Sequence, residues 1–436
     1  ISGLTAIQGN GQPGADNVAM YLRGMATLND ASPLILVDGV PRDDIRVIDP
    51  NEIASVSVLK DASATAVFGV RGANGVIIIT TKRGSAGKPD MNVSVVQSWS
   101  SFTTRPSKLS SLEYINLRNQ AFTNDGTAPE NLPYQPSVIA KFENPLLGLD
   151  PADPDYAKKV AIRRHMYPNH DYYGEFVNNS APQTRINLNA TGGTEKVKYF
   201  INGNYLHQGS NFKHESFDDL GFDASYRNNR FGFRANIDAQ VSKSIKAFLN
   251  VGSYIETMGM PAQPTYIPDW QTTVKHTILV LAGAPPIMPG PTTIDGFGVP
   301  AGESLVPAMI GVTGHELLGR LGFREETRSS LNTSFGLDWD LSKITKGLSH
   351  KALVSYDFYM NSTTQGNQYM PMYDIVLDYA NDTFSYAARR ESQIYMNTWK
   401  SAVTRYYFNL QYSINYNMTF NEKHTVGGLL LAQRGD

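Results

Sequence analysis

The chain has 436 residues and a mass of 48.0 kDa, a length that suggests about two or three domains, or one unusually large β domain. Its 38 basic and 40 acidic side chains nearly cancel, which argues against a nucleic-acid-binding protein and against an acidic disordered tail. Cysteine is absent, so disulfides, thiolate metal sites and a cysteine nucleophile are excluded.

The first 88 residues predict a small α/β unit. The apolar run at residues 33–40 indicates a buried strand, and its Asp38-Gly39 pair is a turn signal. Residues 50–53 can open a helical turn, and residues 56–59 resume a strand.

A short helix and a last strand complete this unit. Asp61 is a good N-cap for a helix over residues 62–68, which Gly69 should end. A turn signal then precedes a β-branched strand at residues 76–81, and residues 83–89 have the composition of a linker.

From Met91 onward the pattern changes to strict alternation of apolar and polar residues. Successive side chains of a strand point to opposite faces, so each such run has one apolar and one polar face. Charged residues make up only 18% of the chain, below the ~25% usual for soluble domains. We expect nine strands here, near residues 91–100, 184–191, 196–206, 231–241, 245–256, 329–341, 350–360, 403–420 and 424–434.

The connections between these strands alternate in length. Short turns on one side and long loops on the other are typical of outer-membrane β-barrels, whereas no apolar run is long enough for a membrane helix. A β-sandwich would show turn signals every ~8–12 residues on both sides. Because bacterial single-chain barrels have an even number of strands, an odd count with a clipped last strand suggests a truncated chain.

Residues 33–41 and residues 59–82 together resemble the plug signature of SusC/RagA-like TonB-dependent outer-membrane transporters. Residues 21–25 are similar to the plug strand upstream of them. Residues 192–205 are similar to the second periplasmic turn and the third barrel strand of that family. The signature positions are Asp38, Gly39, Lys60, Asp61, Ala62, Gly69, Arg71, Gly72, Asn74 and Gly75.

The resemblance implies a 22-stranded antiparallel membrane β-barrel that holds an N-terminal α/β plug. Residues 1–88 would then be the C-terminal portion of the plug domain, and residues 89–436 the N-terminal part of the barrel with its long extracellular loops. Such a transporter is not an enzyme and needs no cofactor. It lies in the outer-membrane lipid of a Gram-negative cell and imports oligosaccharides or peptides.

The same resemblance implies partners. A SusD-like surface lipoprotein would cover the barrel. The TonB–ExbB–ExbD complex would pull on the TonB box, a TonB-contacting segment that this chain lacks. Three alternatives stay open: a lid-free receptor for siderophores or vitamins, a surface adhesin on a barrel scaffold, and a soluble glycan-degrading enzyme.

Motifs for other chemistry are weak. Gly69, Gly72 and Gly75 do not form a phosphate-binding loop. His165 and His170 are five residues apart, a spacing unsuited to two ligands on one helix face. Asp150, Asp153 and Asp155 lie in a loop that lacks the glycine and the glutamate of a calcium-binding loop. Asp338 and Asp340 share the polar face of a strand, and we interpret them as part of the barrel wall rather than as the two carboxylates of a glycosidase.

Aromatic side chains in the long loops are the candidate ligand contacts, because aromatic rings stack well on sugar faces. We also expect ion pairs between plug and wall that involve Arg71 or Arg23, with Asp38 and Asp61 as nearby acids. The candidate stacking residues are Tyr266, Trp270, Tyr373 and Trp399, with Tyr369 and Tyr379 beside them.

Overall fold

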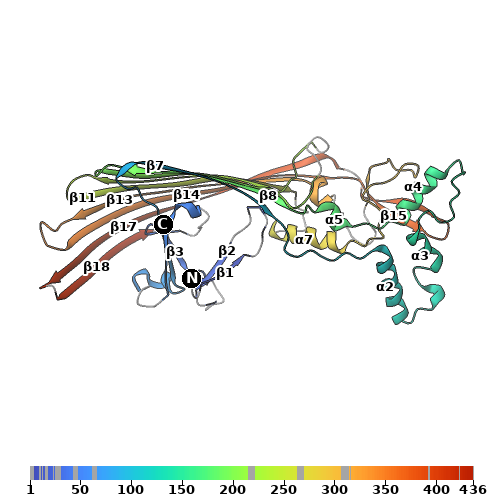
Figure 1. Ribbon diagram of the computed structural model, residues 1–436, viewed down its shortest axis with the longest axis horizontal. Coiled ribbons are helices and arrows are strands. Elements are labelled where there is room, and N and C mark those ends of the chain that lie inside the picture. The colour runs from blue at the N-terminus through green and yellow to red at the C-terminus, as the bar shows by residue number, and fades with distance from the viewer. Residues whose placement is uncertain are drawn as a thin grey trace.

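The computed structural model describes most of the chain and shows three parts: an N-terminal unit (β1 to β6), a large sheet, and a cap formed by the long connections (Figure 1). The described residues are 4–8, 11, 13–14, 18–22, 24, 31–42, 48–60, 66–214, 221–262, 270–305, 314, 316–390, 393–421 and 423–435.

The large sheet has nine strands, and every neighbouring pair is antiparallel. Its spatial order is β18-β17-β14-β13-β11-β10-β9-β8-β7, so all nine predicted strands are confirmed and lie in one sheet. The strands are β7 (Gly87–Ser100), β8 (Ala181–Gly193), β9 (Val197–Gln208), β10 (Arg227–Gln240), β11 (Ile245–Pro261), β13 (Gly322–Asp340), β14 (Leu348–Tyr369), β17 (Gln393–Phe420) and β18 (His424–Gly435).

Several strands continue past their predicted ends on the side of the long connections. β14 runs nine residues further than expected, to Tyr369, and β17 begins at Gln393 rather than near residue 403. Each extension pairs with the extension of its neighbour, as in Gln365 opposite Trp399. Backbone pairing between strands therefore carries the wall beyond the stretch in which apolar and polar residues alternate.

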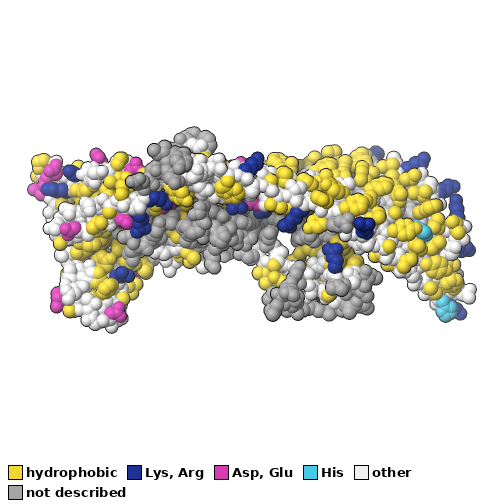
Figure 2. All heavy atoms as spheres, turned by 180° about the vertical axis from the view of Figure 1, so that it is seen from behind, with side chains coloured by type: hydrophobic (Ala, Val, Ile, Leu, Met, Phe, Trp, Pro, Cys, Tyr) yellow, Lys and Arg dark blue, Asp and Glu magenta, His cyan; other side chains and the backbone are white. Residues whose placement is uncertain are grey.

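The sheet has one apolar and one polar face, as the alternation predicts. In β17, Phe408 and Leu410 are 44% and 48% exposed, whereas Asn409 between them is 8% exposed. Figure 2 shows hydrophobic side chains gathered over the sheet on the face seen from behind. The N-terminal unit lies on the opposite side of the sheet (Figure 1). No described helix is long and apolar enough to cross a membrane.

The N-terminal unit contains a hairpin of β1 (Leu4–Gln8) and β2 (Val18–Leu22) and a four-stranded sheet in the order β4-β3-β6-β5. The predicted strands are confirmed, with β3 parallel to β6. The helical turn expected at residues 50–53 is also present, as η2 (Pro50–Glu52). The strands of the sheet are β3 (Leu34–Val37), β4 (Val40–Pro41), β5 (Ile53–Leu59) and β6 (Val76–Thr81).

The short helix of this unit ends at Gly69, as predicted. The backbone of Gly69 is not helical (φ +57°), and it separates one short turn from a second within η3 (Ala66–Gly72). Glycine reaches this left-handed conformation without steric cost, so the chain bends there and resumes its turns. The predicted N-cap Asp61 and the first residues of the helix lie outside the described residues.

The cap consists of the described residues within 101–180, 262–321 and 370–392, for which the sequence predicted only long loops. Many of its elements share one hydrophobic core, to which all three connections contribute, and a separate cluster contains Tyr172, Phe176 and Leu281. Ile115 and Met166 come from the first connection, Ile287 from the second and Phe384 from the third. The elements are α2 (Ser111–Asn124), η4 (Pro129–Asn131), α3 (Pro136–Glu143), α4 (Tyr156–Met166), α5 (Tyr172–Phe176), α7 (Trp270–Gly283), β12 (Ser304–Leu305), η5 (Glu316–Arg320), β15 (Met372–Asp378) and β16 (Thr383–Arg390).

Candidate functional site

The candidate site is the contact between the polar face of the sheet and the N-terminal unit. Its most buried element is the ion pair of Glu52 and Arg234, which are each 2% exposed. Arg234 Nε donates to Glu52 Oε2 at 2.6 Å, and Asn204 donates to the other carboxylate oxygen at 3.2 Å. Glu52 is positioned by η2, whose N-cap Asp49 accepts from the backbone N–H of Asn51. The pair therefore joins the N-terminal unit to β10.

A second contact is built around the turn between β3 and β4. Asp38 has φ +50° there, and its carboxylate accepts from the backbone N–H and hydroxyl of Thr81 at 2.9 and 2.6 Å. Arg83 lies 3.6 Å from Asp38 and also reaches the sheet, where it donates to Asn250 at 2.6 Å and approaches Asp238 at 3.4 Å. The signature residue Asp38 thus fixes β6 and helps to position Arg83 against the wall.

Neutral amides form the rest of this contact. Asn236 donates to the hydroxyl of Thr81 and to the carbonyl of Lys82, both at 2.8 Å. Asn187 donates to the carboxylate of Asp49 at 3.1 Å, which is a bond to a charged group. A hydrogen bond between neutral groups contributes only about 0.5–1.5 kcal/mol net, because water can replace either partner. These amides also bond one another, Asn202 to Asn187 and Asn189, and Asn204 to Asn202.

Two more contacts reach the strands near the other edge of the sheet. Arg42 is 9% exposed and lies 3.4 Å from Asp357 of β14. Gln411 of β17 donates to the carbonyl of Gly39 at 3.1 Å, which confirms that Gln411 is on the inner face. The N-terminal unit therefore contacts strands from β8 to β17.

Gly14, between β1 and β2, is held by the wall on three sides. Its N–H donates to Gln208 at 3.3 Å, and its carbonyl accepts from Arg328 at 3.1 Å. A Cβ atom at this position would overlap the sulfur of Met258, and φ is +73°, so only glycine fits without strain. Arg328 is also paired with Glu326 at 2.9 Å.

The other signature residues have local structural roles where they are described. Gly75 has φ +88° and packs against Leu22, and its N–H donates to the carbonyl of Gly72 at 2.9 Å. Asn74 donates to the carbonyl of Ser32 at 3.4 Å, and Lys60 is half-buried. Asp61 and Ala62 lie outside the described residues.

The predicted ion pair of Arg71 is not found. Arg71 is exposed and has no acidic partner among the described residues, and Arg23 and Asp61 are not described. Ion pairs between the two parts do exist, but they are formed by residues that the sequence did not single out, chiefly Glu52, Arg234 and Arg42. Arg234 alternates with apolar residues in its strand, and that charge on the polar face was the available signal.

Of the candidate stacking aromatics that the structure describes, three tyrosines make contacts within the protein and Trp399 lies on the inner face of the sheet. Tyr373 and Tyr379 pack against the core of the cap, and Tyr379 lies against three other aromatic rings. Tyr369 stacks on the guanidinium of Arg390 at 4.9 Å.

Trp399 is 46% exposed and shares the inner face of β17 with Asn409 and Gln411, because all three have odd numbers in a regular stretch of strand. Tyr266 and the side chain of Trp270 are outside the described residues.

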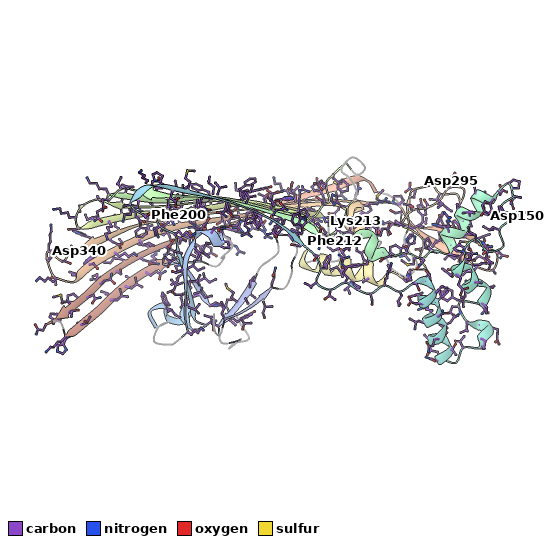
Figure 3. All side chains as sticks on the ribbon, in the orientation of Figure 1. Asp150, Phe200, Phe212, Lys213, Asp295 and Asp340 are labelled. Atoms are coloured by element: carbon purple, nitrogen blue, oxygen red, sulfur yellow. The ribbon has the colours of Figure 1, made fainter. Side chains whose placement is uncertain are left out.

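The histidine and aspartate motifs of the sequence have structural roles where they are described. No group of three or more potential metal ligands occurs among the described residues. Burial lowers the pKa of His165 to about 4, and its ring packs on Phe384, so it is a neutral core side chain. Asp153 pairs with Lys159, and Asp340 bonds to Ser342 in a turn. Figure 3 shows Asp340 at the end of the sheet with short connections and Asp150 at the opposite tip of the cap.

Comparison with known proteins agrees with this architecture. Residues 1–76 match the family model of the TonB-dependent Receptor Plug Domain. The chain is 26% identical over 425 residues to the TonB-dependent receptor P39 of Formosa agariphila, which covers 96% of this chain and 33% of that protein. It is 38% identical over 131 residues to the TonB-dependent receptor SusC of Bacteroides thetaiotaomicron, which covers 28% of this chain and 13% of that protein.

Solved structures show the same fold. The structure of the RagAB peptide importer in its "closed-closed" state superposes with a TM-score of 0.70 at 18% identity. The superposition covers 99% of this chain and 44% of that one. The chain therefore spans a third or less of the length of the curated relatives named above, and under half of that solved chain.

Proposed function

The chain is a SusC/RagA-like TonB-dependent transporter sequence and comprises a plug packed against nine strands of a barrel wall, and we propose that the whole protein imports oligomeric nutrients across a Gram-negative outer membrane. The substrates are glycans in the first place and peptides in the second. A SusD-like surface lipoprotein covers the extracellular side, and the TonB–ExbB–ExbD complex supplies the force. The protein binds its cargo, the lid closes, the plug is displaced and the cargo passes to the periplasm.

The observation that carries this proposal is the nature of the contact between plug and wall. The plug is held by hydrogen bonds from wall amides to its hydroxyl, carbonyl and carboxylate oxygens and by few buried ion pairs, of which Glu52–Arg234 is the most enclosed. Neutral amides can pair with water once the plug leaves, so the wall face stays satisfied in either position. Such a contact positions the plug and still permits its removal under force.

The test is purification of the full-length protein from native outer membranes, followed by mass spectrometry of everything retained. We expect a stoichiometric surface lipoprotein together with a co-purified oligosaccharide or peptide. Recovery of the barrel protein alone with a bound iron chelate or vitamin would contradict the proposal, and would identify a lid-free receptor instead.

A further inference from the structure

The cap contains a cavity of about 170 Å³ that the contact between plug and wall does not use. It lies between the segment that leads from β7 to α2, the start of α5 and the end of α7. Figure 1 shows α5 and α7 beside each other where the cap begins, and Figure 3 labels Phe212 and Lys213 next to them. Three separate stretches of the chain therefore build one hollow at the base of the cap.

The rim of this cavity carries one charged pair of opposite sign. Lys108 Nζ donates to Asp171 Oδ2 at 3.1 Å, and the two side chains are 70% and 38% exposed. Asp171 is fixed in place because its other carboxylate oxygen accepts from the N–H of Gly174 at 2.9 Å. An ammonium and a carboxylate this close present donors and acceptors side by side with no net charge. Such a rim suits a neutral ligand whose groups both donate and accept.

The floor is apolar and rigid. Leu281, Pro285 and Pro286 are buried in it, and Tyr172 is 5% exposed and donates to the carbonyl of Met288 at 3.1 Å. The ring of His170 lies 5.2 Å from that of Tyr172, and its backbone N–H donates to Pro286. A ligand unit with a C–H face and a polar edge can lie on this floor and reach the rim.

The size limits what the cavity can hold. Pockets for complete small ligands usually have about 300–1,000 Å³, so this cavity takes one unit of an oligomer rather than a whole ligand. A sugar ring combines apolar C–H faces with hydroxyls that donate and accept, so one such ring can use both the ammonium of Lys108 and the carboxylate of Asp171.

We propose that this cavity is a saccharide subsite of the cap that holds one sugar unit of a neutral glycan. Lys108 and Asp171 bond adjacent hydroxyls, and the floor supports the ring face. The subsite rests on the proposed function in one respect, since it identifies the cargo as a glycan rather than a peptide.

The floor also connects the subsite with the wall of the sheet. Leu281 and Tyr172 belong to a hydrophobic cluster that includes Met258 on the inner face of β11. Met258 is the side chain that lies against Gly14 of the plug. The floor of the subsite is therefore joined to the plug through one wall side chain, Met258.

The test is binding of the purified full-length protein to an array of short neutral oligosaccharides of varied sugar and linkage, with short peptides printed beside them. We expect at least one oligosaccharide to bind and to slow hydrogen exchange in residues 107–109 and 281–284. Lys108→Met should weaken that binding about tenfold, the effect of losing one hydrogen bond to a charged group. Ala282→Trp, which fills the cavity from the exposed end of α7, should abolish it.

The matched control is Lys158→Met, which removes an exposed lysine of α4 outside the cavity and should leave binding unchanged. Absence of binding to every oligosaccharide, or binding of peptides alone, would overturn the subsite, as would binding that Ala282→Trp does not change. The two proposals fail separately. A lipoprotein recovered from membranes without oligosaccharide binding leaves the importer intact, whereas oligosaccharide binding by a protein without a lipoprotein leaves the subsite intact.

Discussion

At the scale of single residues, Glu52 and Arg234 form a buried ion pair whose two members respond differently to the loss of their partner. Burial raises the pKa of Glu52, and the charge and hydrogen bond of Arg234 oppose that effect. A carboxyl group that loses its partner can take up a proton and become neutral, whereas a guanidinium cannot lose its charge in a protein. The arginine is therefore the member of the pair that more strongly needs its partner.

We expect Glu52→Ala to destabilise the seating of the plug by about 3–5 kcal/mol, the cost of leaving a buried charge unpaired. Arg234→Ala should cost less, and its effect should shrink as the pH falls, because Glu52 then binds a proton and no longer carries a buried charge. Hydrogen exchange of residues 48–60 in the full-length protein measures the seating.

The control for this pair is Arg185→Ala. Arg185 lies 3.6 Å from Asp49 and is 33% exposed, so its loss should cost at most about 1 kcal/mol. Equal effects of Glu52→Ala and Arg185→Ala would show that the buried pair does not hold the plug. An Arg234→Ala defect that does not change with pH would show that Glu52 is not the group left unpaired.

At the scale of elements, the sequence predicts the strands well and the contacts poorly. Every wall strand was predicted because alternation of apolar and polar residues is a local property, and the two faces of β17 follow from it. The helices of the cap were missed because their apolar residues are buried together with residues of distant connections, as Ile115 is in the cluster that also contains Phe384. Glu52 was missed because nothing near it in the sequence shows that Arg234 would lie 2.6 Å away.

The facing of β17 gives a prediction at this scale. Leu410 is 48% exposed on the apolar face, and an arginine on the lipid side of a barrel near the membrane midplane costs about 2–4 kcal/mol. Leu410→Arg should therefore reduce the amount of folded full-length protein in outer membranes far more than Gln411→Arg, whose side chain is on the inner face. Heat-modifiable migration in gels measures the folded fraction, and equal losses for the two variants would contradict this facing.

At the scale of the whole molecule, the cap ties together connections that are far apart in the sequence. Asp382, in the turn between β15 and β16, accepts from Lys141 of α3 at 2.7 Å and from Tyr167 at 2.5 Å. Arg163 of α4 lies 2.7 Å from the same carboxylate. One side chain therefore joins the third connection (residues 370–392) to the first (residues 101–180), and we expect the two connections to move together.

This fastening should depend on pH. Burial would raise the pKa of Asp382, but the hydrogen bonds from Lys141 and Tyr167 and the charges of Arg163 and Lys141 outweigh it and hold the pKa below the ordinary value of 3.8. A carboxyl whose pKa is lowered on folding stabilises the fold above its ordinary pKa, and that contribution is lost as the pH falls through the lowered value. The two connections should thus stay joined at neutral pH and separate only in strong acid.

Asp382→Asn should reproduce the acid effect at neutral pH, because an amide cannot neutralise Lys141 and Arg163. With the carboxylate about a quarter exposed, we expect a loss of about 1–3 kcal/mol, measured as faster hydrogen exchange in both β15–β16 and α3–α4 of the full-length protein. Asp378→Asn is the matched control, since Asp378 bonds only to Ala380 and Asn381 within its own turn and should alter exchange there alone. If Asp382→Asn sped up exchange in the hairpin but not in α3–α4, the two connections would not move as one body.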